Sequence, residues 1–437
     1  MLHAAPLAET AAMLRSGQLD LLDYIHRLCD RIDAFEPQLQ ALLPEENRRA
    51  RLLADAAALS QRYPDPARRP PLYGIPVGIK DMFFVDGFPT RCGTQLPPEL
   101  FQGQEGDYLL ALRRAGALIL GKTVTTEFAY FEPGPTRNPH NLDYSPGGSS
   151  SGSAAAVAAG FCPLAIGTQV IGSTVRPAAY CGIVGFKSSY ARVPINGWVL
   201  CSEALEHLGI FTQDVEGMAL AASLLCQDWR LEAAIPSETL PVLGVPDGPY
   251  LQQASPEALE AFEQQLAHLR QAGYHVKRIK AFEDIEAINR RHSRIVFAQM
   301  AQIHAPWFTQ YSSQYRPRTL AAIQEGRQVS EEELAAMLPE RLALRHQVEE
   351  QMAYEGIDLW VCPPTTGPAP RGFANTGSPL MNLPWTHTGM PAITLPAGQA
   401  ANGLPLGLQL VAPYMRDEQL LAWAQPVADI MNATPYS

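Results

Sequence analysis

The distribution of apolar segments constrains the fold of this chain more than any other feature of its sequence. Strands are predicted at 75–79, 117–120, 163–167, 242–245, 274–279, 359–362, 392–395 and 406–410, most of them apolar without alternating polar residues. Such segments are typical of strands that are buried on both faces. Helical patterns lie between them at 107–115, 151–160, 215–226 and 256–272. The alternation predicts an α/β fold with a central twisted mixed β-sheet that is covered on both faces by α-helices.

Two helical regions flank or interrupt this alternation. Residues 7–61 are expected to form N-terminal helices, because apolar residues recur three and four positions apart. Residues at about 285–355 are expected to form a helical excursion, within which Ser330 and Glu333 have the spacing of a capping box. The segment at about 72–225 holds the motifs described below. Since no repeat or low-complexity linker divides the chain, residues 1–437 are expected to form a single large domain.

Composition and charge exclude several classes of protein. The chain has 33 Lys and Arg against 44 Asp and Glu, a net charge of −11 without a local basic patch, so nucleic-acid binding is not expected. The 7 cysteines are scattered and form no C-x-x-C pair, which favours reduced thiols in the cytoplasm. The N-terminal residues do not resemble a signal peptide, and the longest nearly apolar run, at 154–167, is too short to cross a bilayer. A membrane protein is therefore not expected.

Three separate segments contain the side chains of a candidate acyl-transfer site. Lys80 follows the strand at 75–79, the Gly/Ser run 147–153 leads into an alanine-rich helix, and Ser173 ends the turn at 167–173. A serine hydroxyl needs a base to remove its proton, and a lysine can be that base if burial keeps its amine neutral. The backbone N–H groups at 170–173 could converge to hold an oxyanion. Taken singly, each segment also fits an ordinary role: a solvated lysine, a flexible loop and a simple turn.

The order of these motifs resembles that of the amidase signature family of serine hydrolases. The segment 74–81 matches the lysine motif of the family, 147–154 its Gly/Ser motif, and 167–187 its nucleophile segment. Further blocks that follow in the family order are 121–129, 138–139, 363–365, 382–384, 389–392 and 403–409. The resemblance therefore covers nearly the whole chain, with 285–355 as the part that lacks a matching motif.

The resemblance implies an amidase that cleaves a C–N bond through an acyl-enzyme intermediate. Ser173 is the implied nucleophile, Ser149 the bridging serine after a cis peptide bond, and Lys80 the base. Arg176, Ser150 and Ser151 are expected to brace the site. The residues implied in oxyanion and substrate binding are Val170, Ile171, Gly172, Gly147, Gly148 and Tyr130.

No cofactor or metal is implied, and the 10 histidines show no H-x-x-x-H pair. The expected partner is a small-molecule substrate, a neutral amide, anilide or carbamate. The chain is expected to act as a monomer or homodimer.

The chain departs from the family pattern at the nucleophile segment. The commonest form is T-D-T-G-G-S, where this chain has Gln169 for the Asp and Ile171 for the first Gly; Ser151 also replaces a glycine of the Gly/Ser motif. Gln169 can still hydrogen-bond the turn, whereas the branched Ile171 requires a backbone without positive φ. Aromatic residues near the motifs either form an apolar substrate pocket or pack in the core: Phe83, Phe84, Tyr130, Phe131, Trp198 and Trp307.

Three other interpretations remain open at this point. Residues 148–152 fit the G-x-S-x-G nucleophile elbow of an α/β-hydrolase with Ser150 as nucleophile, but an elbow needs a preceding strand and 138–146 is loop-like. The same fold could be the glutamine-hydrolysing component of a tRNA-dependent amidotransferase, which passes ammonia to a partner. The chain could also be an inactive scaffold that binds a partner, although Lys80, Ser149 and Ser173 are intact.

Overall fold

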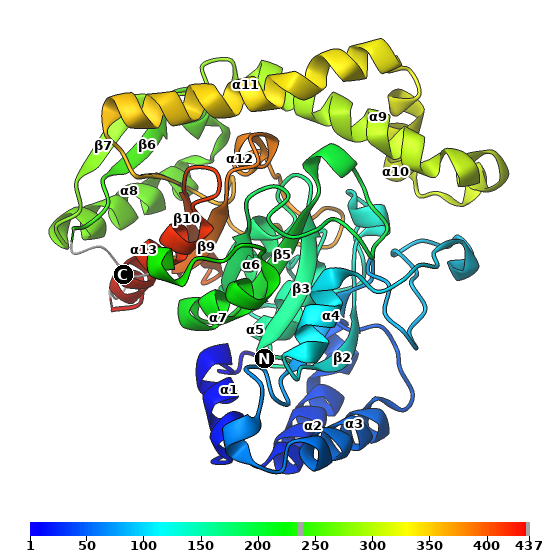
Figure 1. The fold of residues 1–437 in the computed structure, drawn as a ribbon. Coiled ribbons are helices and arrows are strands. Elements are labelled where there is room, and N and C mark those ends of the chain that lie inside the picture. Colours follow the sequence, from blue (N-terminus) through cyan, green and yellow to red (C-terminus); the bar gives the residue numbers. More distant parts are fainter. Residues whose placement is uncertain (235–238, 434–437) are drawn as a thin grey trace.

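A mixed β-sheet runs through the centre of the computed structural model, which describes residues 1–234 and 239–433 (Figure 1). The strand order in this 10-stranded sheet is β2-β1-β3-β5-β4-β9-β10-β8-β6-β7. The strands are β1 (Pro76–Lys80), β2 (Leu118–Thr123), β3 (Leu164–Gln169), β4 (Val184–Lys187), β5 (His207–Thr212), β6 (Leu243–Asp247), β7 (Val276–Lys280), β8 (Leu359–Cys362), β9 (Ala392–Gln399) and β10 (Pro405–Val411). β1 pairs in parallel with β2 and β3, while β5 is antiparallel to β3 and β4. The predicted mixed α/β fold is confirmed.

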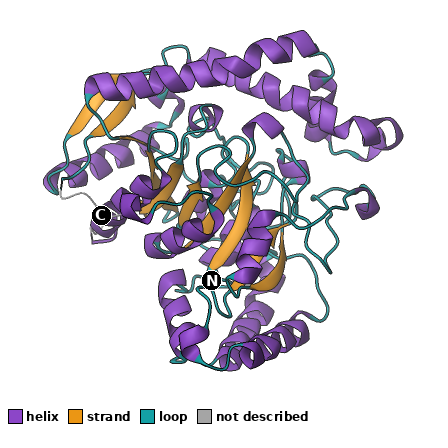
Figure 2. Cartoon of the chain, in the orientation of Figure 1, coloured by secondary structure: helices purple, strands orange, loops and turns teal. Residues whose placement is uncertain are grey.

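Helices pack on both sides of the sheet (Figure 2). They are α1 (Leu7–Ser16), α2 (Leu21–Leu39), α3 (Arg48–Arg62), α4 (Asp107–Arg114), α5 (Ser151–Ala158), α6 (Val175–Cys181), α7 (Val215–Leu225), α8 (Pro256–Gln271), α9 (Ile285–Tyr311), α10 (Pro317–Gly326), α11 (Glu331–Glu355), α12 (Leu383–His387) and α13 (Asp417–Ala433). In Figure 1, α1, α2 and α3 lie at the bottom of the view, and α9, α10 and α11 form a layer at the top. α9 contacts α10, α11 and α12, so the helical excursion packs onto the body of the protein.

The parallel strands β1 and β3 bring two of the sequence motifs to the same edge of the sheet. Their register pairs Ile79 with Ile166, so that both strands end close together, at Lys80 and Gln169. Ligand sites of open α/β sheets lie at the carboxyl ends of such strands. α5 begins at Ser151, directly after the Gly/Ser run, and is buried along its whole length, where it packs on β1, β2, β3 and β5. The fold therefore places Lys80, Ser149 and the turn after β3 beside one another.

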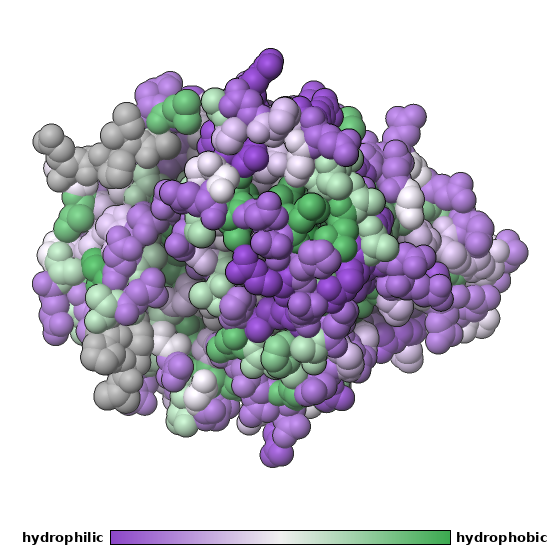
Figure 3. Space-filling view, turned by 90° about the horizontal axis from the view of Figure 1, so that it is seen from below, coloured by the Kyte–Doolittle hydropathy of each residue, from purple (hydrophilic) through white to green (hydrophobic). Residues whose placement is uncertain are grey.

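The surface is polar over most of the face seen from below, with an apolar area near its middle (Figure 3). Among the described helices, none is both long and apolar enough to span a bilayer.

Candidate active site

Lys80, the last residue of β1, is fully buried and hydrogen-bonded to two hydroxyl groups. Its Nζ donates to Ser149 Oγ and to Thr168 Oγ1, both at 2.7 Å. Burial lowers the pKa of Lys80 from the usual 10.5 to about 7, because an apolar surrounding disfavours the charged ammonium. A neutral amine near neutral pH is the form that a general base requires.

Ser149 follows a cis peptide bond from Gly148, as the resemblance implies. The carbonyl oxygen of Gly148 accepts a hydrogen bond from Nη2 of Arg176 at 2.7 Å. Gly147 has a φ of +84°, and a Cβ at this position would lie 2.8 Å from the Cα of Pro177. A residue with a side chain would be both strained and obstructed there, so this glycine lets the loop hold Ser149 beside Lys80.

Ser149 and Ser173 line the same small cavity, whose volume is about 20 Å³. Ser173 lies in the turn between β3 and α6, with 7% of its surface exposed. The complete lining is Ala129, Tyr130, Phe131, Ser149, Val170, Ile171, Ser173, Arg176, Cys201 and Val296. The structure thus brings together both serines and three of the six residues implied in oxyanion and substrate binding, namely Tyr130, Val170 and Ile171. Phe131 and Arg176, also named from the sequence, line the same cavity.

Gly147, Gly148 and Gly172 do not belong to this lining and pack instead against other parts of the protein. A Cβ at Gly148 would lie 2.9 Å from Cγ2 of Thr376, and one at Gly172 would lie 2.3 Å from Oδ1 of Asn382. Their backbones therefore approach neighbouring side chains more closely than a larger residue would allow.

Gln169 and Ile171 fit the turn as the sequence predicts. Oε1 of Gln169 accepts hydrogen bonds from the backbone N–H groups of Thr174 and Val175, at 2.8 and 3.0 Å, and Nε2 donates to Thr386 Oγ1 at 3.0 Å. Gln169 therefore accepts hydrogen bonds from the first backbone N–H groups of α6, which have no carbonyl partner within the helix. The backbone of Ile171 avoids positive φ, as its branched side chain requires.

Arg176 lines the cavity and holds the Gly/Ser loop in place. It is 2% exposed, and its guanidinium donates to the carbonyl oxygens of Gly148, Thr376 and Gly377. Burial lowers its pKa to about 10. Because its donors are directed at backbone carbonyls, Arg176 ties the Gly/Ser loop to the segment around residue 376.

Ser150 and Ser151 are also engaged with the backbone. Ser150 Oγ donates to the carbonyl of Thr168 at 3.2 Å and accepts from its N–H at 3.3 Å, and Ser151 Oγ donates to the carbonyl of Val124. Ser150 is fully buried, and no strand occurs in residues 138–147. The nucleophile-elbow interpretation is therefore wrong, because it needs a strand before an exposed Ser150.

Two residues that had no role in the sequence prediction, Thr168 and Glu206, lie near Lys80. Thr168 is the second hydroxyl on the amine. Glu206 is 1% exposed, its Oε2 accepts the backbone N–H of Cys201 at 2.9 Å, and its negative charge opposes the lowering of the Lys80 pKa. Burial raises the pKa of Glu206 itself to about 7. Glu206 lies outside the quoted motifs, so the sequence carries no signal for it.

The predicted aromatic pocket is reduced to two residues. Tyr130 and Phe131 line the cavity. Phe83 instead packs against Tyr108 and Trp198, with ring centroids 4.8 and 5.0 Å apart, and Trp307 packs against Phe101 at 5.1 Å. Phe84 borders a separate surface hollow formed by residues between 84 and 103. Phe83, Phe84, Trp198 and Trp307 therefore pack outside the cavity and do not line it.

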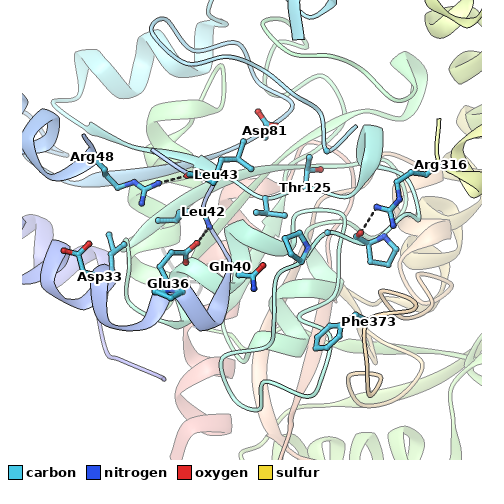
Figure 4. A pocket seen from close by; sticks show the side chains of 18 residues that line it. Asp33, Glu36, Gln40, Leu42, Leu43, Arg48, Asp81, Thr125, Arg316 and Phe373 are labelled. Atoms are coloured by element: carbon cyan, nitrogen blue, oxygen red, sulfur yellow. Dashed lines mark hydrogen bonds between the residues drawn. The ribbon is translucent and has the colours of Figure 1, made fainter. Parts of the chain in front are cut away.

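A much larger cavity, of about 880 Å³, lies between α2 and the segments around residues 81–93 and 124–135 (Figure 4). None of the predicted site residues lines it. Three of its polar side chains are engaged with the backbone: Glu36 accepts from the N–H groups of Ala41 and Leu42, Arg48 donates to the carbonyl of Leu43, and Arg316 donates to that of Pro133. Size alone therefore does not identify the functional cavity. Within residues 1–234 and 239–433, no group of three or more His, Cys, Asp or Glu side chains could hold a metal ion.

Comparison with known proteins assigns the chain to a family. The family profile described as Amidase matches residues 23–421. A component of the glutamyl-tRNA(Gln) amidotransferase of Synechococcus sp. (strain RCC307) is 30% identical over 488 residues, which cover 98% of this chain and 99% of that protein. A crystal structure of an amidase is 29% identical with a TM-score of 0.88, covering 98% of this chain and 100% of the other. Native peptide amidase from Stenotrophomonas maltophilia, 24% identical with a TM-score of 0.82 over 99% of this chain and 98% of its own, shares the fold. The chain therefore belongs to the amidase family and is an enzyme that acts on C–N bonds.

Proposed function

We propose that the chain hydrolyses a small neutral amide with Ser173 as nucleophile, Ser149 as bridging serine and Lys80 as base. The observation that carries this proposal is the buried Lys80–Ser149 hydrogen bond of 2.7 Å beside the cavity that Ser149 shares with Ser173. Neutral Lys80 takes a proton from Ser149 while Ser149 takes the proton of Ser173, and Ser173 Oγ attacks the carbonyl carbon. Ser149 then returns a proton to the leaving nitrogen, and water hydrolyses the acyl-enzyme through the same groups.

The turn after β3 is the proposed oxyanion site. The backbone N–H groups of Val170, Ile171, Gly172 and Ser173 are the candidate donors to the oxygen that becomes negatively charged in the transition state. Donors of this kind are fixed before the reaction begins, and removal of one typically raises the barrier by about 3 to 4 kcal/mol.

The substrate is proposed to carry an apolar or aryl arm. Apart from the two serines and Arg176, the cavity walls are Ala129, Tyr130, Phe131, Val170, Ile171, Cys201 and Val296. Tyr130 and Phe131 also border a second hollow, of about 390 Å³, whose other lining residues are the apolar Phe297, Ala321 and Ala322 and the charged Arg318 and Glu325. The inner cavity is much smaller than the roughly 300 Å³ of a typical ligand pocket. We therefore propose that the reacting carbonyl enters the small cavity beside Ser149 and Ser173. The aryl arm would lie in the second hollow, once the rings of Tyr130 and Phe131 between the two have shifted.

Glutamine hydrolysis in an amidotransferase is the second candidate, because of the 30% identity to the glutamyl-tRNA(Gln) amidotransferase component. Free glutamine carries an ammonium and a carboxylate, and each needs a charged or strongly polar partner when it is removed from water. The lining of the cavity around Ser149 and Ser173 contains no carboxylate, and its arginine already donates to three carbonyl groups. The second hollow carries one glutamate, Glu325, and one arginine, Arg318, whose guanidinium already donates to the carbonyl oxygens of Phe131 and Ala374. These features support a neutral substrate, an amide, anilide or carbamate, for a chain that acts alone.

A matched substrate panel tests this proposal. An acyl-anilide, a primary amide, an ester and a carbamate that share one aryl arm are compared with L-glutamine, and kcat/KM is measured for the purified chain. We expect cleavage of the neutral aryl substrates without a second protein, and little or none of glutamine. A preference for glutamine or other charged substrates, or a strict requirement for a partner protein, would contradict it.

Replacing Glu206 by glutamine is expected to move the acidic limb of the pH profile to lower pH. The charge of Glu206 raises the pKa of Lys80, so its removal lets the lysine lose its proton in more acidic solution. Oε1 of a glutamine can still accept the N–H of Cys201. The measurement is kcat/KM against pH for Glu206→Gln and the wild type. A limb that stays in place or moves to higher pH would show that Glu206 does not act on the base.

A further inference from the structure

Helix α9 reaches the oxyanion turn from the part of the chain that has no matching sequence motif. His292, on α9, is fully buried, and its Nε2 lies 3.0 Å from the carbonyl oxygen of Val170. A carbonyl oxygen can only accept a hydrogen bond, so Nε2 of His292 carries the proton and donates it. The contact joins residues that are 122 positions apart in the sequence.

A second histidine fixes the ring of His292. The Nδ1 atoms of His292 and His387, the last residue of α12, lie 3.3 Å apart. Since Nδ1 of neutral His292 is an acceptor, Nδ1 of His387 is the donor. Burial, with the neighbouring Arg341 guanidinium, lowers the pKa of His292 to about 3 and that of His387 well below 6.5. Both rings are therefore neutral, and the His387 bond sets the tautomer in which His292 donates to the turn.

The next carbonyl of the turn is held in the same way. Thr386 Oγ1 donates to the carbonyl oxygen of Ile171 at 2.6 Å and accepts a hydrogen bond from Nε2 of Gln169 at 3.0 Å. Two successive carbonyl groups of the turn, at Val170 and Ile171, are thus bonded from outside the cavity by α9 and α12.

These bonds determine where two backbone N–H groups point. In a trans peptide unit, the carbonyl of one residue and the N–H of the next lie in one plane and point in opposite directions. A bond that holds the carbonyl of Val170 toward α9 therefore directs the N–H of Ile171 to the opposite side, and the Thr386 bond does the same for Gly172. Both N–H groups are candidate oxyanion donors.

We propose that His292, held by His387, is a positioning residue that orients the N–H of Ile171 toward the reacting oxygen. The inference rests on the proposed function of the turn, and it gives α9 a part in catalysis although α9 carries no reacting group. Positioned donors act mainly in the transition state, so their loss lowers kcat and leaves KM nearly unchanged.

The test compares two substitutions of His292 with a matched control on the same helix. His292→Leu removes the donor, whereas His292→Gln keeps an N–H that can reach the carbonyl of Val170. His304→Leu is the control, because His304 is also a fully buried histidine of α9 but bonds the hydroxyl of Tyr315 at 3.0 Å. The readouts are kcat and KM for the best panel substrate, the melting temperature, and the rate at which phenylmethylsulfonyl fluoride labels Ser173, followed by mass spectrometry. In the labelling reaction the Oγ–S bond forms, fluoride leaves, and the proton of Ser173 passes through Ser149 to Lys80.

We expect His292→Leu to lower kcat and the labelling rate ~10- to 100-fold, because a displacement of about 1 Å at the reacting centre can cost on the order of 100-fold, with KM within about threefold. His292→Gln should recover most of this loss, and His304→Leu should lower the melting temperature but not kcat. Unchanged kcat in His292→Leu, no recovery with glutamine, or an equal loss of kcat in His304→Leu would overturn the inference. In each of these cases labelled Ser173 in the wild type still supports the proposed function, whereas a wild type that is not labelled at Ser173 overturns both.

Discussion

Replacing Ser173 by alanine is expected to lower kcat by about 10⁴- to 10⁶-fold, as in serine hydrolases that lose their nucleophile. Ser173 shares its cavity with Ser149, but Ser149 Oγ is hydrogen-bonded to Lys80 Nζ. No acyl-enzyme can form on alanine, so the intact mass of the variant should also stay unchanged after incubation with phenylmethylsulfonyl fluoride. Both kcat and the mass shift are measured on protein whose thermal unfolding matches that of the wild type.

Ser150→Ala is the control for this experiment. Ser150 is a neighbouring serine whose hydroxyl bonds the backbone of Thr168. We expect this variant to keep the mass shift and to lose less than about tenfold in kcat, since it removes a hydrogen bond worth about 1 kcal/mol. Activity that survives in Ser173→Ala would refute the assignment of the nucleophile, and a mass shift that disappears in Ser150→Ala alone would point to Ser150.

The sequence predicts the strands of the sheet that are apolar throughout, because a strand that is buried on both faces consists mainly of apolar residues. The segment predicted at 75–79 is β1, at Pro76–Lys80, and the strand at 359–362 is β8 with the same bounds. Neither β4 nor β5 was predicted. β5 begins with His207 and contains Gly209, and it is held by antiparallel pairing with β4, the preceding strand, and with the more distant β3. Such pairing leaves little local signal.

In the candidate site, too, some residues could be predicted from the sequence and others could not. Lys80, Ser149 and Ser173 lie in short motifs whose residue types are set by their own chemistry, so a resemblance finds them. His292 and Thr386 contact the turn after β3 from distant segments, and Glu206 influences Lys80 only through its charge, so neither periodicity nor spacing marks these residues. The aromatic residues illustrate the limit: Tyr130 and Trp198 look alike as sequence features, and only packing shows that Tyr130 lines the cavity while Trp198 packs against Phe83.

The acidic limb of the pH profile is expected near pH 7 and should disappear when Lys80 is replaced by methionine. In the proposed mechanism the neutral amine of Lys80 is the reactive form, and burial lowers its pKa to about 7. Below that pH the neutral fraction, and with it kcat/KM, falls about tenfold per unit, and above it the rate levels off. Methionine fills a similar volume without a base, so kcat should fall by about 10³- to 10⁵-fold and lose this pH dependence.

Urea unfolding separates the loss of a base from the loss of the fold. Between pH 7 and 10.5 the unfolded chain holds a proton on Lys80 that the folded chain has released, so the contribution of this group to stability rises with pH across that range. Methionine removes this penalty at neutral pH, and we therefore expect urea unfolding to show a Lys80→Met protein that is no less stable than the wild type.

Lys187→Met is the matched control for the pH profile. Lys187 is also fully buried with a pKa lowered by burial to about 7, but its Nζ donates to the carbonyl oxygens of Ser188 and Met390, and it does not line the cavity. Its replacement should lower stability, because two carbonyls lose their donor, and leave the acidic limb in place. If the limb vanished in Lys187→Met, or if Lys80→Met kept its activity within tenfold, Lys80 would not be the base. Lys80 and Lys187 are both fully buried and both have a pKa lowered to about 7. If the acidic limb of the pH profile depends on Lys80 alone, the pH dependence follows from the place of Lys80 beside Ser149 and not from burial as such.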